Sequence, residues 1–243
     1  MLLAGVAMLL APSAVVAGPE RRVLVVTEAA GFRHDSIEAA KALLRRLAKR
    51  SPQYRVRFLS TARELTRQRL RRAHAVAFVN TTGELPLTGE QQQALLDFVR
   101  SGKGFVGTHS ASDTLHQWPA YARLLGGEFE AHPFVGEGRV VVEDRRHPAT
   151  RHLPVSFLIR EEFYVFRQDP RCCSHVLAAL DTTSFGVPAA DAPLVWCRRE
   201  GRGRVFYDAL GHFIETWHDA RQRKLLAGGI AWALGLRRHP ACG

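Results

Sequence analysis

An apolar strand that stops at a polar turn sets the main constraint on how this chain folds. Residues Gly104–Thr108 form a short apolar run, and the chain then turns through His109 and Ser110 before a helix-like segment near 118–125. Ligands of open α/β sheets bind at the carboxyl ends of strands. The turn therefore delivers His109 and Ser110 to a candidate binding edge. The strand and turn have the layout of a nucleophile elbow, although the G-x-S-x-G motif of hydrolases is absent.

Apolar strands alternate with amphipathic helices along the first half of the chain. The expected strands are 22–27, 54–59, 73–79 and 104–108, and the expected helices lie near 39–47, 61–72, 88–100 and 118–125. This alternation predicts an α/β fold with a doubly wound, mostly parallel sheet and helices on both faces. Because crossovers between parallel strands are right-handed, we expect the loops that carry His34, Thr81 and His109 to share one edge of the sheet.

The second half of the chain is richer in strands. We expect strands at 138–143, 156–166, 175–180, 193–199 and 204–207, and a last helix at about 218–234. His212 follows the last of these strands, and Glu162 and Tyr164 lie within the strand 156–166. The 243-residue chain is long enough for one large core, and no linker or repeat divides residues 18–243. We therefore expect a single domain there.

The first residues, 1–17, are apolar and carry no charged side chain. Val15 and Ala17 fit a signal-peptidase site before Gly18, and the run is short for a membrane span. We therefore expect residues 1–17 to be a signal peptide, with a buried or anchoring helix as the alternative. The mature protein would then be periplasmic or secreted, with no membrane attachment after cleavage.

The cysteines leave two arrangements open. The chain has four of them, Cys172, Cys173, Cys197 and Cys242. Export would permit a disulfide, for which Cys173–Cys197 is one candidate, and two free buried thiols are the alternative. Because no C-x-x-C spacing occurs, we do not expect a cysteine zinc knuckle.

Basic residues outnumber acidic ones, and the formal net charge is +11. The excess is concentrated in residues 45–72, where Glu64 is the only acidic side chain. Such a tract can meet phosphates, but no nucleic-acid-binding motif accompanies it. We interpret it as a solvated face and expect no nucleic-acid partner.

Several short motifs, taken in order, resemble the trehalose-utilisation (ThuA-like) family from about residue 22 to 236. They are Gly31–His34, Gly107–Asp113, Gly126–Phe129 with His132-Pro133, His147–Thr150, Glu161–Tyr164, Pro193–Trp196, Gly203–Tyr207 with Leu210–His212, and Gly229–Ala233. The resemblance implies the flavodoxin-like fold of class I glutamine amidotransferases and a role in the metabolism of oxidised (keto) disaccharides.

The same resemblance bears on the chemistry. An amidotransferase elbow holds a cysteine whose partners are a distant histidine and a glutamate. His109 stands at the cysteine position and His212 resembles the partner histidine, so glutaminase chemistry through a thioester lacks its nucleophile. The family's usual Asp-Glu pair is Glu161-Glu162 in this sequence.

Histidines and a carboxylate make up the candidate site. The expected catalytic groups are His109, His212 and Glu162, and the expected substrate contacts are His34, His132, Ser110, Asp113 and Tyr164. Histidine transfers protons near neutral pH. Three histidines and a carboxylate also suit Zn²⁺, the one cofactor considered, for which the candidate ligands are His109, His132, His212 and Glu162. Structural, hydrogen-bonded histidines are the third interpretation.

The serines and aromatic residues near these groups each have two possible roles, one functional and one structural. Ser110 or Ser112 would be a nucleophile with His212 as its base, but a serine after an elbow more often caps a helix. Trp118, Trp196 and Trp217 would stack on sugars or pack in the core. We expect an enzyme, such as a hydrolase, that processes an oxidised (3-keto) glycoside, for example a trehalose derivative. A non-catalytic carbohydrate-binding module is the alternative, and in both cases the partner is a small carbohydrate.

Overall fold

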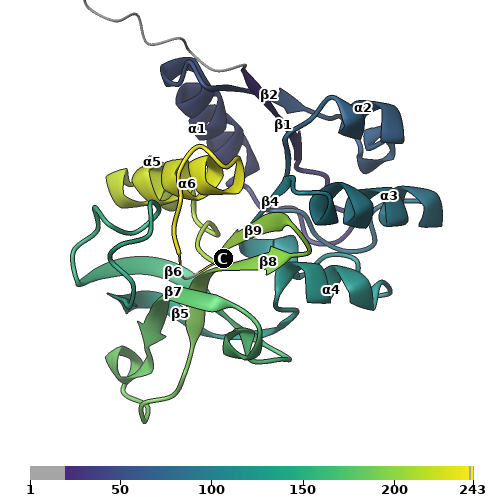
Figure 1. Cartoon of the computed structure of the whole chain (residues 1–243). Helices are drawn as coiled ribbons and strands as arrows, with labels where there is room; N and C mark the ends of the chain where they lie inside the picture. The colour runs from purple at the N-terminus through teal and green to yellow at the C-terminus, as the bar shows by residue number, and fades with distance from the viewer. Residues whose placement is uncertain (1–19, 241, 243) are drawn as a thin grey trace, which may run out of the picture.

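The computed structural model describes residues 20–240 and 242, and the expected signal peptide lies outside these residues (Figure 1). Within the described part, one nine-stranded sheet runs in the order β2-β1-β3-β4-β9-β8-β7-β5-β6. None of the helices described there is both long enough and apolar enough to cross a membrane.

Strands and helices follow one another in the predicted order. The strands are β1 (Arg21–Val26), β2 (Tyr54–Phe58), β3 (Ala75–Val79), β4 (Gly104–Thr108), β5 (Phe129–Val142), β6 (Ser156–Phe166), β7 (His175–Asp181), β8 (Pro193–Glu200) and β9 (Gly203–Asp208). The α-helices are α1 (Ile37–Arg50), α2 (Arg67–Arg71), α3 (Gly89–Arg100), α4 (Pro119–Leu125), α5 (Ile214–His218) and α6 (Ala220–Ala233). Single 3₁₀ turns cover Ala62–Glu64, His109–Ser112, Pro170–Cys172 and Thr182–Phe185.

The sheet has a parallel half and an antiparallel half. Strands β2, β1, β3, β4 and β9 run parallel to one another, as the alternation predicted. Strands β8, β7, β5 and β6 extend the sheet in antiparallel fashion. The change of direction occurs between β9 and β8, where Glu200 pairs with Gly203 across a turn with Gly201 at φ 57°. A two-residue turn of this kind joins only antiparallel neighbours.

Helices cover both faces of the parallel half. Figure 1 shows α1, α5 and α6 on one side of the sheet and α3 and α4 on the other. Helix α1 buries Leu43, Leu44 and Leu47 against the sheet, which is the spacing of one helical face. Thr88 is the N-cap of α3, and its side chain accepts the backbone N–H of Gln91 in a reciprocal capping box. The parallel half is therefore a doubly wound, flavodoxin-like sheet.

One expected helix is divided and another is preceded by a short helix that was not expected. Residues 61–72 form a 3₁₀ turn and then α2, because the Thr66 side chain accepts the N–H of Arg69 and starts a new helix. A capping side chain starts a helix even where the apolar pattern runs on, so the prediction of one helix over 61–72 was wrong in this respect. The expected last helix, 218–234, corresponds to α6, which Asp219 caps by accepting the N–H of Arg221 at 2.6 Å, and the separate helix α5 comes before it.

Strand β5 starts nine residues earlier than the expected strand, at Phe129 instead of Gly138. The early part contains Pro133, which cannot donate to a neighbouring strand. The pairing of β5 with β6 shifts register between Ala131 and Phe134, and this irregularity accommodates the proline. The predicted start of this strand at Gly138 was therefore too late, because a strand interrupted by a proline and a register shift does not show a regular pattern.

The disulfide differs from the expected pair. Cys197 on β8 bonds to Cys242 in the C-terminal tail, 45 residues further on, whereas Cys172 and Cys173 are exposed free thiols. The Cys197 side chain points into the protein and is fully buried, and the tail passes directly over it. The candidate Cys173–Cys197 bond was therefore wrong, and so was the alternative of buried free thiols.

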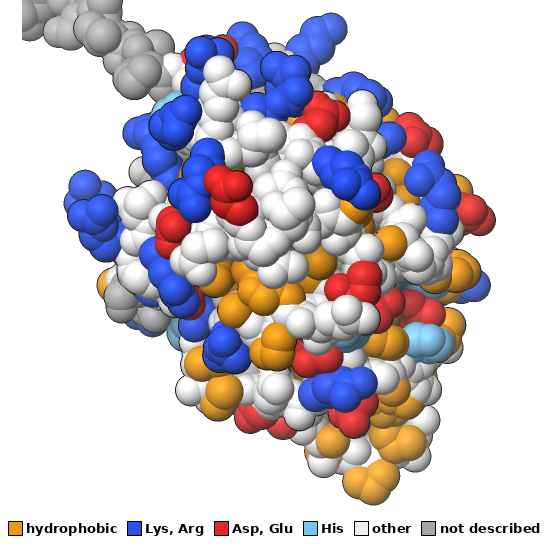
Figure 2. Space-filling view, turned by 90° about the vertical axis from the view of Figure 1, so that its right-hand side faces the viewer, with side chains coloured by type: hydrophobic (Ala, Val, Ile, Leu, Met, Phe, Trp, Pro, Cys, Tyr) orange, Lys and Arg blue, Asp and Glu red, His pale blue; other side chains and the backbone are white. Residues whose placement is uncertain are grey.

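Basic side chains are distributed among acidic ones on the surface. Figure 2 shows Lys and Arg side chains as separate groups with Asp and Glu between them on the face that it displays. Within the basic tract, Arg67 lies 3.1 Å from Glu90 of α3, and Arg69 pairs with Glu64. Such exposed pairs contribute little to stability and keep the face hydrated. This is the arrangement expected of a solvated surface.

Candidate functional site

Four side chains converge at the carboxyl ends of the parallel strands. His34 follows β1, His109 follows β4, His212 follows β9, and Glu162 comes from β6 of the antiparallel half. One ring nitrogen or carboxylate oxygen from each lies within 4.8 Å of the others. We call this group the strand-end cluster. It brings together three histidines that the loop positions predicted at one edge, with the carboxylate that the sequence paired with them.

His109 lies at the centre of the strand-end cluster. Its side chain has no exposed surface, and its φ of 46° is in the left-handed region that a β-branched or bulky residue rarely adopts. The ring Nδ1 lies 2.9 Å from the carbonyl oxygen of Ala209 and therefore donates a proton to it. In the neutral ring Nε2 is then unprotonated. It faces the Nε2 of His34 at 3.1 Å and the hydroxyl of Tyr164 at 3.1 Å.

Close packing beneath the elbow holds His109 in this conformation. A Cβ on Gly107 would lie 2.7 Å from Leu125 Cδ1 and 3.0 Å from a ring carbon of Tyr207, so only glycine fits there. The Tyr207 hydroxyl donates to the His109 carbonyl at 2.6 Å. The strained residue is thus fixed both from the strand side and through its own backbone.

Glu162 links the histidines electrostatically. Its Oε2 lies 2.9 Å from His212 Nδ1 and 3.5 Å from His109 Nε2. Burial opposes ionisation of Glu162, but the neighbouring rings of His109 and His212 hold its pKa well below the usual range. The reverse holds for His212, because the Glu162 carboxylate raises its pKa against the effect of burial. Glu162 therefore favours the imidazolium form of His212.

His34 is the neutral member of the strand-end cluster. Burial, together with the nearby rings of His109 and His212, lowers the pKa of His34 to about 3. Its Nδ1 lies 3.4 Å from the Ser110 hydroxyl, and its ring meets that of His109 edge-on at 4.7 Å. Ser110 therefore orients His34, and its hydroxyl is not paired with His212 as a serine nucleophile would require.

Aromatic side chains form one wall beside His109. The Tyr164 ring lies 4.4 Å from the His109 ring, and Phe129 lies 4.4 Å from Tyr164 on the other side. Burial raises the pKa of Tyr164, and the Glu162 carboxylate raises it further, so the phenol stays a proton donor. His132 lies at the rim with half of its side chain exposed, and its Nδ1 is 3.5 Å from Glu162 Oε1.

Other predicted site residues lie elsewhere. Asp113 turns away from the strand-end cluster and binds His116 at 2.8 Å. Ser112 bonds to the Tyr207 hydroxyl, again as part of the elbow's support. Trp196 and Trp217 are fully buried with their ring N–H groups on backbone carbonyls, which assigns them to the core. A sugar-stacking role for these two tryptophans is therefore excluded.

Sequence reasoning missed the residues that hold the His212 loop. Glu161 is fully buried, and its carboxylate accepts the N–H groups of Gly211 and His212, each at 3.1 Å, and the Thr216 hydroxyl. On the other side, Asn80 and Ser36 both donate to the Gly211 carbonyl, at 2.8 and 2.9 Å. The adjacent pair Glu161-Glu162 could have indicated this role. Neighbouring residues of a strand face opposite sides, so the two carboxylates contact different partners.

The donor set of the strand-end cluster fits Zn²⁺. Three imidazoles and one carboxylate are ligands that zinc prefers. The bond from His109 Nδ1 to a backbone carbonyl is the outer contact that orients metal-bound histidines. Within the described residues His212 Nδ1 is buried and its contact with Glu162 is not a well-directed hydrogen bond, so the neutral form of His212 could present this nitrogen to an ion. The set differs from the expected one in a single member, because His34 replaces the rim residue His132.

The sequence matches the family model described as "ThuA: Trehalose utilisation" over residues 22–233. That match covers most of the chain, so the protein belongs to the ThuA family. No curated protein sequence matches this chain.

Solved structures agree with this family. A ThuA-like protein from Bacteroides uniformis has a TM-score of 0.78 at 23% identity, with 92% of this chain and 95% of that chain covered. A ThuA-like protein from Parabacteroides merdae has a TM-score of 0.72 at 18% identity, with coverages of 91% and 94%. A β-galactosidase from Bacillus circulans covers 93% of this chain with only 33% of its own, at a TM-score of 0.58 and 16% identity. At these identities the likeness concerns the fold alone.

Proposed function

We propose that this protein is an enzyme that processes an oxidised (3-keto) glycoside, such as a derivative of trehalose, at the strand-end cluster. One observation carries the proposal: ring nitrogens of His109 and His212 both face one oxygen of Glu162, whose carboxylate raises the pKa of His212. A base and an acid in one site are what glycoside cleavage beside a ketone requires. Membership of a trehalose-utilisation family supports the sugar substrate.

The ketone determines the chemistry. A carbonyl at C3 acidifies the hydrogen on C2, and the glycosidic oxygen on C1 leaves once that hydrogen is removed as a proton. His109 Nε2 takes the C2 proton while the C1–O bond breaks and a C1=C2 double bond forms. His212 gives its proton to the departing oxygen. Water then adds its oxygen to C1 and a proton returns to C2, so the net reaction is hydrolysis.

Glu162 and Tyr164 assist these two histidines. Glu162 keeps His212 protonated until the leaving group needs the proton, and Tyr164 donates to an oxygen that gains negative charge. His109 has no exposed surface, so a substrate reaches Nε2 only when the wall formed by Tyr164 and the rim residue His132 opens. A bound Zn²⁺, held by His34, His109, Glu162 and His212, would supply a Lewis acid for a carbonyl oxygen.

The test is turnover of a 3-keto glycoside by purified protein in D₂O. Hydrolysis through removal of the C2 hydrogen places deuterium on C2 of the released sugar, which mass spectrometry detects. Unreacted substrate without deuterium, and no release of sugar, would leave a non-catalytic carbohydrate-binding module as the better description. Metal analysis of the same sample then separates metal-free proton transfer from a zinc mechanism.

The site of action is part of the proposal. An exported protein would explain both the apolar residues 1–17 and the disulfide between Cys197 and Cys242, since disulfides persist in oxidising compartments. Sequencing of the mature N-terminus tests this: Gly18 is expected, and an intact Met1 in a cytosolic fraction would contradict it.

A further inference from the structure

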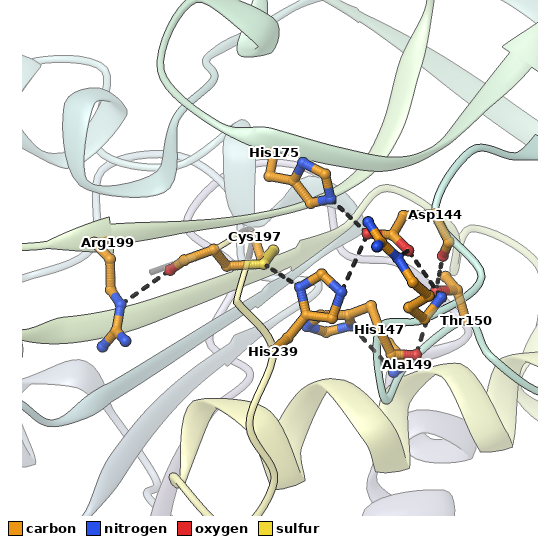
Figure 3. The surroundings of a disulfide bond; sticks show 10 residues. Asp144, His147, Ala149, Thr150, His175, Cys197, Arg199 and His239 are labelled. Carbon is orange, nitrogen blue, oxygen red and sulfur yellow. Dashed lines mark hydrogen bonds and ion pairs between the residues drawn. A yellow bond between two sulfur atoms is a disulfide. The ribbon is translucent and has the colours of Figure 1, made fainter.

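A second group of histidine and carboxylate side chains, with no member in the strand-end cluster, lies beside the disulfide (Figure 3). Asp144 follows β5, His175 begins β7, and His239 belongs to the C-terminal tail after α6. One donor atom from each lies within 4.8 Å of the other two. We call these three residues the tail cluster. They come from three segments far apart in the sequence, and no pattern in the sequence joined them.

The spacing of the tail cluster suits a small cation. Asp144 Oδ2 lies 2.8 Å from His175 Nε2 and 3.2 Å from His239 Nε2. Two donors on a tetrahedral Zn²⁺, with bonds of about 2.0–2.2 Å, are about 3.3 Å apart. The three donors are therefore already close to the positions that one ion would require.

His239 provides an independent observation at the tail cluster. Its Nδ1 lies 3.7 Å from Cys242 Sγ, and a disulfide sulfur can only accept, so a hydrogen bond here places the ring proton on Nδ1. Nε2 then presents a lone pair toward the Asp144 carboxylate, and within the described residues it is buried without a hydrogen-bond partner. The side chain is only 2% exposed. A lone pair facing a carboxylate oxygen is repulsive unless a proton or a metal ion lies between them.

The neighbours of the tail cluster orient it as outer contacts orient metal ligands. Asp144 Oδ1 accepts the backbone N–H of Arg146 at 2.8 Å, which leaves Oδ2 free to face the two histidines. The His147 ring lies 5.1 Å from that of His239 and is fixed by the N–H of Ala149 on its Nδ1. An open cavity of about 310 Å³, lined in part by Asp144 and His175, gives these two residues access to solvent.

We propose that Asp144, His175 and His239 bind a Zn²⁺ ion that fastens the C-terminal tail to the antiparallel half of the sheet. Two imidazoles and one carboxylate form a donor set that zinc prefers, and a water molecule completes four-coordination. The ion and the disulfide hold the same tail at neighbouring points. An ion that binds only the folded protein raises its stability by mass action.

The experiment measures Zn²⁺ binding to the mature chain after removal of metals with a chelator. It uses a His109→Gln, His212→Gln background, so that ions held by the strand-end cluster do not contribute. In that background we expect one equivalent of Zn²⁺ by calorimetry and a rise in melting temperature. Adding His239→Gln should weaken the affinity by about tenfold or more and abolish the rise in melting temperature.

His152→Gln is the matched control. His152 also has a buried Nε2 without a partner, but it lies outside the tail cluster, so this variant should bind Zn²⁺ as the background does. His175→Gln is a second test, on a side chain that is 31% exposed at the start of a strand and therefore more accessible than His239. Binding that is equal in the background, His239→Gln and His175→Gln proteins would overturn the proposal.

Discussion

The strand-end cluster and the tail cluster contain the same residue types but are built by different parts of the fold. In the strand-end cluster, three of the four members follow parallel strands at their carboxyl ends. In the tail cluster, the members come from the antiparallel half and from a tail that a disulfide ties to β8. The first arrangement follows from topology, and the second follows from where a covalent bond places the end of the chain.

The clusters also differ in charge and in support. Glu162 is shared by two histidines of which one gains a proton, and the backbone around it is held by Glu161 and by a strained elbow. Asp144 faces two histidines in the tail cluster, where His239 has an unpartnered nitrogen. The first cluster is organised for proton transfer and the second for holding an ion. Variants that affect one cluster and spare the other test this contrast.

The largest expected effect is on turnover. His109→Ala removes the base of the strand-end cluster and should lower the rate of 3-keto glycoside cleavage by about 10²–10⁴-fold, the usual contribution of general acid–base catalysis. His239→Ala alters the tail cluster and should leave that rate unchanged. Steady-state kinetics with circular dichroism as the folding control make the measurement. A folded, fully active His109→Ala protein would refute the role given to this residue.

Loss of the disulfide should have the opposite effect to His109→Ala: stability should fall while turnover persists. Cys242→Ser frees the tail and should cost about 2–4 kcal/mol of unfolding free energy, the range for a disulfide that closes a loop of this size. Because the strand-end cluster lies elsewhere, turnover at temperatures well below melting should persist. Urea denaturation of Cys242→Ser beside Cys173→Ser, which changes an exposed free thiol, gives the comparison. Equal midpoints for the two variants would mean that the tail bond contributes nothing.

The contrast explains what could be predicted from the sequence. The helix and strand order, the parallel half and the meeting of His34, His109 and His212 follow from local patterns and the handedness of crossovers. The Cys197–Cys242 bond and the tail cluster could not be predicted this way, because they depend on the path of the C-terminal tail over β8.

Within the strand-end cluster, too, some residues could not be predicted from sequence patterns. The sequence singled out Glu162 but not Glu161, although Glu161 is the more deeply buried of the two and accepts both loop N–H groups. His132 was expected among the metal ligands, but a register shift in β5 leaves it at the rim. Residues that act by supporting a loop or by standing at a bulge leave no periodic signal in the sequence.

Substitutions of Glu161 and Glu162 can be compared with each other, and their effects on stability should be smaller than that of losing the disulfide. Glu161→Gln weakens the buried acceptor of Gly211, His212 and Thr216, and should cost about 1–3 kcal/mol of stability while lowering kcat through the displaced His212. Glu162→Gln should lower kcat and also lose stability at neutral pH, because a carboxylate whose pKa is lowered on folding stabilises the folded protein above its unfolded pKa. Denaturant titration and kinetics on both proteins measure the two effects. A Glu161→Gln protein as stable as the wild type would contradict the support assigned to Glu161.

The last prediction concerns the pH dependence of stability and involves Asp208 at the end of β9. Burial raises the pKa of Asp208 to about 7, from the usual 3.8. The folded protein therefore keeps a proton that the unfolded chain releases between these values, so this group makes stability fall as pH rises from about 4 to 7. Its slope is at most about 1.4 kcal/mol per pH unit. His34 and His147, whose pKa values are lowered to about 3, act in the opposite sense below about pH 6.5.

Asp208→Asn isolates this contribution without emptying the site. Asp208 Oδ1 accepts the N–H of Leu210 at 3.1 Å, and Oδ2 accepts the Gln222 side-chain N–H at 2.7 Å. An asparagine keeps the first bond, and its amide N–H group can meet Gln222 Oε1, which has no partner in the described structure, once the Gln222 amide turns over. Urea denaturation at pH 4, 5, 6 and 7 should show that the stability of the variant relative to the wild type increases with pH. Parallel curves for the two proteins would mean that Asp208 is ionised in the folded state throughout this range.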